Sequence, residues 1–242
     1  MELFLDANRW IHIVVGFVGL AAFWFPIFAR KGGPLHRAAG KVFRYSAMVV
    51  VSAAGLAVVL HSARALLEGH SVAADPAGWS FLMFLGYLAL VTGGILSHGF
   101  GVLREKRDLT ALNTPYRRAT AWAMIGGSVF IVAWAIYWQP PNAILLYALS
   151  PIGIGNGLGI LAVLNGRRIG PGQWKLEHLN ALIGCGIAFH TAFAVFGMSR
   201  FLPVQLPGAW QVLPWILPAA IGIPAGIIWT RYYRNRLSPA AG

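Results

Sequence analysis

Long apolar runs separated by short polar connections constrain the fold of this chain more than any other feature. The seven runs lie at about residues 10–29, 42–63, 79–103, 119–138, 142–164, 176–199 and 211–230. Each is close to the roughly 20 residues that an α-helix needs to cross the hydrocarbon of a bilayer. Continuous apolar runs without strict alternation favour helices over a β-barrel. We therefore predict an all-α fold, a single domain over residues 1–242 that forms a bundle of seven transmembrane helices.

The composition excludes a soluble globular domain. Hydrophobic residues make up 57% of the chain and charged residues only 11%, whereas soluble domains carry about 25% charged residues. So many apolar side chains do not fit into one core of this size, and they must therefore face lipid. The single cysteine, Cys185, lies in an apolar run, so the chain has neither a disulfide framework nor a CxxC motif.

The distribution of basic residues predicts the orientation. The net charge is +12, and all but three of the 19 Lys and Arg residues fall in connections on one side; the exceptions are Arg9, Arg64 and Arg200. The positive-inside rule assigns the basic side to the cytoplasm. We expect a multi-pass protein of the bacterial inner membrane, with its N-terminus outside and its C-terminus cytoplasmic. The bilayer is then its partner, and nucleic-acid binding is not needed to explain the charge.

Three histidines are predicted to share one depth near the inner face. His36 lies in the first turn of the second span, His98 near the end of the third, and His178 near the start of the sixth. Three imidazole ligands leave a position open on a transition metal for water or substrate. We predict a Zn, Fe or Cu site with His36, His98 and His178 as ligands, and Glu177 as catalytic proton acceptor or as a residue that orients the ligands. Separate hydrogen-bonding roles for these histidines are an equal alternative.

His190 lies deeper than the other histidines of the sixth span. It follows Lys175 by fifteen residues, about 22 Å along a helix, and follows His178 by twelve, about 18 Å. The second separation suits two stacked b-type haems, although the two side chains would point about 120° apart. His12 and His190 are the candidate haem ligands, and Arg37 would meet a haem propionate or a lipid phosphate.

Three functions follow from these candidate sites. We expect a metal or b-type haem site near the cytoplasmic face and transmembrane redox chemistry with a redox partner. One alternative is a metal-dependent membrane hydrolase acting on a small-molecule substrate, with Glu177 as base and Ser97 as helper, although no HExxH motif is present. Another is a small-solute or proton transporter in which His190 relays protons.

The fifth run carries alternate glycines, Gly153, Gly155, Gly157 and Gly159. This spacing predicts close helix packing. Room for a flat cofactor, or a locally unwound substrate site near Asn156, is the alternative.

Three segments resemble motifs of an uncharacterised family of bacterial multi-pass membrane proteins, a domain of unknown function. They are WIHIVVGFVGL at 10–20, KGGPLHRAAGKVF at 31–43, with Phe43 in place of the usual tyrosine, and EHLNALIGCGIAFHTAFAVFG at 177–197. The resemblance implies no activity. It implies that the motif residues are His12, His36, Arg37, Gly40, Glu177, His178 and His190. The chain also has a looser similarity to two-haem transmembrane cytochromes.

Overall fold

The computed structural model describes residues 2–198 and 208–237, and within these ranges it contains helices and no β-strand. The α-helices are α1 (Glu2–Phe28), α2 (Pro34–Leu67), α3 (Pro76–Arg104), α4 (Pro115–Trp138), α5 (Ala143–Leu149), α6 (Pro151–Leu164), α7 (Gln173–Ala192) and α9 (Leu213–Leu237). Shorter elements are the 3-10 helices η1 (Leu109–Leu112) and η3 (Gly208–Val212) and the π-helical turn η2 (Phe193–Gly197). Arg200 and the predicted span end at residue 199 lie outside the described residues.

The described residues contain seven helical segments long and apolar enough to cross a membrane, which confirms the predicted number. The fifth segment joins α5 to α6, and the sixth joins α7 to η2. Several helices begin earlier than the apolar runs: α1 begins at Glu2 and α2 at Pro34. The reason is that helical hydrogen bonding continues past the end of an apolar run. The 34 residues of α2 are about 51 Å long, so this helix extends well beyond the roughly 30 Å of hydrocarbon.

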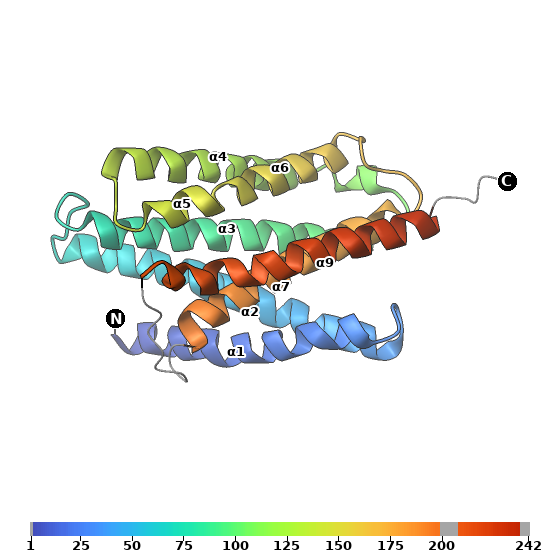
Figure 1. The fold of residues 1–242 in the computed structure, drawn as a ribbon, viewed down its shortest axis with the longest axis horizontal. Helices are drawn as coiled ribbons and strands as arrows, with labels where there is room; N and C mark the ends of the chain where they lie inside the picture. Colours follow the sequence, from blue (N-terminus) through green and yellow to red (C-terminus); the bar gives the residue numbers. More distant parts are fainter. Residues whose placement is uncertain (1, 199–207, 238–242) are drawn as a thin grey trace.

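The helices lie side by side along the long axis of the molecule (Figure 1). An antiparallel pair, α1 and α2, forms one side, and α4 with α5 and α6 forms the other. Between them, α3 packs against α2, α4 and α7, and α7 also packs against α9. The start of α1 and the end of α9 lie at opposite ends of the bundle (Figure 1), as an odd number of spans requires.

Proline and short polar residues set the starts of the helices. α2, α3, α4 and α6 each begin with proline, whose missing N–H costs nothing in a first turn. Asp75 accepts a hydrogen bond from the Gly78 N–H at the start of α3, and Thr114 accepts one from the Arg117 N–H at the start of α4. These caps fix where each span enters the bundle.

Tyr87 of α3 holds the junction between α5 and α6. Its hydroxyl lies 2.8 Å from the Ser150 carbonyl oxygen and accepts from the Gly153 N–H at 2.9 Å. Pro151 cannot donate to the Tyr147 carbonyl, and the Ser150 hydroxyl donates to it instead at 3.0 Å. The fifth span therefore consists of two consecutive helices, and the backbone groups that lose helical partners at their junction are hydrogen-bonded to side chains instead.

The alternate glycines of α6 divide between two environments. A β-carbon on Gly153 or Gly157 would lie within 2.8 Å of atoms of α4, whereas one on Gly155 would meet nothing within 4 Å. Close packing against α4 therefore uses only every second one of these glycines.

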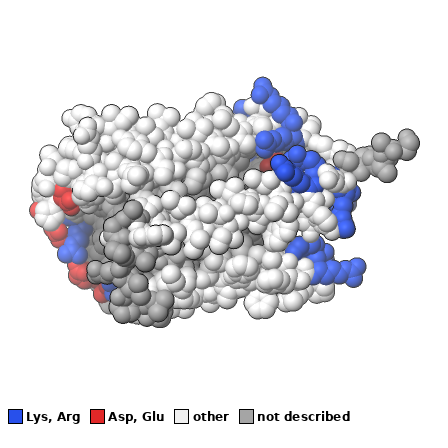
Figure 2. Space-filling view, viewed as in Figure 1, with Lys and Arg blue, Asp and Glu red and all other residues white. Residues whose placement is uncertain are grey.

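The two ends of the bundle differ in charge. Lys and Arg gather at the end formed by the α1–α2, α3–α4 and α6–α7 connections and the close of α9, which we call the basic end (Figure 2). Four acidic residues, Glu2, Asp6, Glu68 and Asp75, lie together with only Arg9 and Arg64 of the described basic residues at the opposite end, which we call the acidic end; it is formed by the start of α1 and the α2–α3 connection (Figure 2). Between the ends the visible surface is uncharged (Figure 2). The large apolar side chains that the bundle exposes include Phe25, Val129 and Ile228. Such a surface suits a lipid environment.

Candidate functional site

A histidine and a carboxylate meet between α3 and α7, within the interior of the bundle. His98 Nε2 lies 3.2 Å from Glu177 Oε2, and the two residues are only 5% and 8% exposed. The other carboxylate oxygen, Oε1, accepts a hydrogen bond from Gln173 Nε2 at 2.7 Å. His98 precedes Arg104 by six residues, so this His98–Glu177 pair lies about 9 Å along α3 from the basic end.

Glycine at position 99 brings the two helices close enough for the pair to form. A β-carbon on Gly99 would lie 2.6 Å from the β-carbon of Ala181 in α7, which is closer than real side chains approach. The Gly99 carbonyl oxygen accepts a hydrogen bond from His178 Nδ1 at 2.8 Å, because a carbonyl cannot donate. This second contact, one residue from each member of the pair, fixes the register of α3 on α7.

Arg117 supports the same segment of α3 from the other side. Its guanidinium donates to the Ser97 carbonyl oxygen at 3.5 Å and occupies the space where a β-carbon of Gly101 would lie. Residues 97–101 of α3 are thus held by α4 on one side and by α7 on the other.

One nitrogen of the pair has no bonding partner. His98 Nδ1 is buried and has no hydrogen-bond partner among residues 2–198 and 208–237. A buried polar atom in that condition costs about 1–3 kcal/mol, so native proteins seldom retain one without a use. A neutral imidazole and a carboxylate together carry one negative charge, and one added proton makes the pair neutral. A second added proton could bind at His98 Nδ1, or the first could leave from there.

The three predicted metal ligands each have a separate partner among the described residues, and their role as metal ligands stays a prediction. His36 Nδ1 lies 3.3 Å from the Pro26 carbonyl oxygen, His178 bonds to the Gly99 carbonyl, and His98 bonds to Glu177. Each imidazole therefore has its own partner. Within the described part of the chain, no group of three or more His, Cys, Asp and Glu residues is arranged to hold a metal ion. His36, His98 and His178 share a depth without converging as ligands of one ion.

His190 is held between α1 and its own helix. Trp24 Nε1 donates to His190 Nε2 at 3.1 Å, and His190 Nδ1 lies 2.7 Å from the Gly186 carbonyl oxygen. Because an indole only donates and a carbonyl only accepts, the ring is neutral and carries its proton on Nδ1. An iron bound at Nε2 would have to displace Trp24. The role of His190 as a haem ligand or proton relay stays a prediction.

The other predicted haem-site residues lie apart from one another. His12 is half-buried and bonds to the backbone carbonyl of Val50 in α2. Arg37 is exposed in the first turns of α2. Neither one is joined to His190 by a contact among the described residues.

The sequence analysis missed the supporting residues Gln173, Arg117, Trp24 and Tyr87. Gln173 stands four residues before Glu177, one helical turn away, and that spacing was a usable sign of contact. The other three contact different helices, so no spacing along the chain reveals their partners.

Comparison of the chain with protein-family models, with curated proteins and with solved structures finds no match. The described residues define a helical bundle with seven helices long and apolar enough to cross a membrane, which supports a multi-pass membrane protein. The resemblance of residues 10–20, 31–43 and 177–197 to an uncharacterised membrane family remains a prediction.

Proposed function

We propose that this chain moves protons across a bacterial cytoplasmic membrane, with the His98–Glu177 pair as its proton-carrying site. The observation that supports this is a buried histidine bonded to a buried carboxylate between two spans, with one imidazole nitrogen that has no partner among the described residues. Ionisable groups inside membrane bundles mark proton relays and transport pathways more often than structural contacts. This proposal falls in the transporter class predicted as an alternative from the sequence.

The charge of the pair explains why proton exchange would drive movement. With one proton the pair is neutral as a unit; with none or two it carries a net charge in a low-dielectric interior. A net charge there is costly, so a change of protonation favours a rearrangement that brings water or a counter-charge to the pair. Gln173 already bonds to Glu177, and the half-buried Arg117 bonds to the backbone carbonyl of Ser97, the residue before His98.

The orientation follows from the charge asymmetry of the two ends. We propose that the basic end faces the cytoplasm and the acidic end faces outward, as the positive-inside rule predicts. The pair then lies on the cytoplasmic side of the bundle, and its protons would exchange first with the cytoplasm.

Proton flux into lipid vesicles tests this function. Purified protein is reconstituted with an internal pH dye, and a potassium gradient with valinomycin makes the interior negative. We expect vesicles with the wild-type protein to acidify much faster than protein-free vesicles. Acidification should be about tenfold or more slower with Glu177→Gln or His98→Gln than with wild type, because each variant removes one proton-exchanging group. Asp108→Asn is the matched control, since Asp108 is exposed in the α3–α4 connection and the amide still caps η1.

Wild-type vesicles that acidify no faster than protein-free ones would refute the proposal. So would unchanged flux in both pair variants, provided that each variant elutes as a monodisperse protein in detergent.

Redox function with b-type haem, and metal-dependent hydrolysis, stay predictions from the sequence. The absorption spectrum of the purified protein tests the first, because a bis-histidine haem gives sharp bands that shift on reduction. Elemental analysis for zinc tests the second.

A further inference from the structure

A second polar site lies at the acidic end, far from the His98–Glu177 pair. A cavity of about 300 Å³ opens there between the close of α2, the α2–α3 connection and the start of α3. Its wall includes His61, Glu68, His70, Asp75, Trp79 and Leu82. Pockets that bind small molecules begin at about this volume, so the cavity suits a compact ligand.

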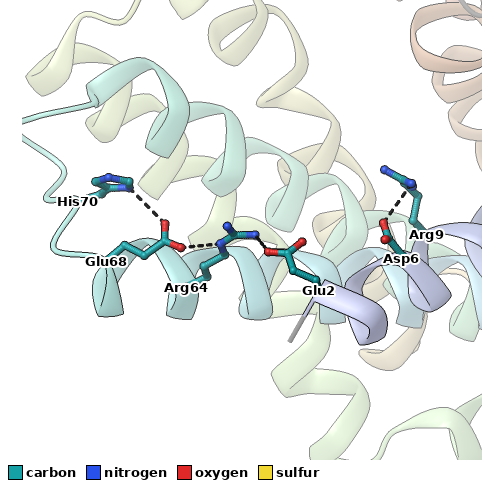
Figure 3. Close-up of polar contacts among 6 residues, drawn as sticks. All are labelled: Glu2, Asp6, Arg9, Arg64, Glu68 and His70. Carbon is teal, nitrogen blue, oxygen red and sulfur yellow. Dashed lines mark hydrogen bonds and ion pairs between the residues drawn. The ribbon is translucent and has the colours of Figure 1, made fainter.

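The wall of the cavity carries an excess of negative charge. Arg64 also lines it, but its guanidinium is already bonded to Glu68 Oε1 at 2.7 Å and to Glu2 (Figure 3). Glu2 lies outside the cavity wall, so the wall itself carries two carboxylates, Glu68 and Asp75, against one guanidinium. His70 Nδ1 lies 3.8 Å from Glu68 Oε2 (Figure 3). Asp75 uses Oδ1 to cap the Gly78 N–H of α3. The basic side chain is therefore neutralised while carboxylate charge remains.

Aromatic and apolar side chains complete the wall. Trp79 is 7% exposed, and Leu82 stands one turn further along α3. An indole is the aromatic ring that attracts organic cations most strongly, and carboxylates form strong charge-assisted bonds with ammonium groups. The described residues contain no group of three or more His, Cys, Asp and Glu arranged for a metal. The combination of charge and aromatic surface therefore suits an organic cation.

We propose that this cavity binds a primary ammonium group on a compact carrier, with Glu68 and Asp75 as its anionic partners and Trp79 as its aromatic wall. Two sources share this chemistry: a free small amine, and the ethanolamine headgroup of a phospholipid. The cavity lies where α2 ends and α3 begins, at the level that lipid headgroups occupy when the spans cross the bilayer. Neither His98 nor Glu177 lines this cavity. Amine binding here is therefore independent of the proposed proton movement.

Binding is measured with the full chain in nanodiscs of phosphatidylglycerol, which brings no amine. Ethanolamine is titrated by calorimetry to test the free amine, and retention of phosphatidylethanolamine over phosphatidylglycerol by native mass spectrometry tests the lipid. We expect at least one of the two probes to bind, and Glu68→Gln and Asp75→Asn each to weaken it about tenfold. Asparagine keeps the helix cap at position 75, so that variant removes charge without removing the start of α3.

Asp6→Asn is the matched control. Asp6 is another carboxylate of the acidic end, paired with Arg9 and outside the cavity wall (Figure 3), and we expect its loss to leave binding unchanged. Binding of ethanolamine assigns the site to a free amine, and retention of phosphatidylethanolamine alone assigns it to lipid. The proposal is overturned if neither probe binds, or if Asp6→Asn weakens binding as much as Glu68→Gln and Asp75→Asn do.

Discussion

Single polar side chains inside the bundle determine how its apolar helices fit together. Tyr87 is the clearest case, since one hydroxyl serves the Ser150 carbonyl, the Gly153 N–H and the Ser128 hydroxyl. In hydrocarbon no water replaces a lost partner. Such residues therefore have a larger effect on stability than their number suggests.

Tyr87→Phe removes that hydroxyl while keeping the ring. We expect the free energy of unfolding to fall by about 1–3 kcal/mol, because a buried carbonyl and a buried N–H lose their partner. Tyr137→Phe is the control: Tyr137 is 77% exposed, and its change should have an effect near zero. Denaturant titration in detergent micelles measures both, and equal effects would show that the Tyr87 bonds contribute nothing.

At the residue scale, the sequence predicted the chemistry of the site in part. Glu177 and His98 were both chosen because ionisable groups are costly inside a span, and the structure places them in contact. Glu177 was predicted to orient one or more of the three histidines, but which histidine it contacts was not predicted, because hydropathy reports depth and not direction. The same limit explains the metal site: His36, His98 and His178 share a depth, but each ring points to a different partner.

Between elements, the spacing of α3 and α7 decides whether the pair forms. That spacing depends on Gly99, where the helices approach too closely for a side chain. The number of spans was predictable from the apolar runs, but several helix ends were not, since α1 and α2 begin about eight residues before their runs. The pairing of helices was not predictable either, because apolar spans carry little information about their neighbours.

Gly99→Ala tests the importance of this approach. The added methyl group would meet Ala181, so we expect the free energy of unfolding to fall by about 1–3 kcal/mol through overpacking, together with slower proton flux. In Gly126→Ala of α4 the new β-carbon meets nothing within 4 Å, and alanine favours the helix. That variant should be unchanged or more stable. Thermal unfolding of the two variants side by side checks the difference, which should vanish if the spacing has no role.

At the scale of the whole molecule, the contrast between the two ends predicts the topology. Cys185 is fully buried, so it leaves little background for thiol labelling. A membrane-impermeant maleimide should label Ala73→Cys, at the acidic end, on intact cells. It should label Lys106→Cys, at the basic end, only after the membrane is permeabilised. Labelling in the reverse order would contradict the proposed orientation.

The acidic end also predicts a pH dependence of stability. The hydrogen bond from Arg64 lowers the pKa of Glu68 below its ordinary value of 4.5. The folded state therefore favours the carboxylate, so its contribution is present above pH 4.5 and is lost as the pH falls through the lowered pKa. Wild type should be more stable than Glu68→Gln at pH 7, and this difference should disappear in acid. Unfolding midpoints over that pH range measure it, and a constant difference would contradict the linkage.

Infrared difference spectroscopy of the protein in lipid, between acid and alkaline conditions, tests most directly whether the His98–Glu177 pair exchanges a proton. We predict carboxyl bands that change with pH in wild type, that are lost in Glu177→Gln and that shift in His98→Gln. Identical difference spectra for wild type and Glu177→Gln would contradict the account, because they would mean that the buried carboxylate keeps one protonation state throughout.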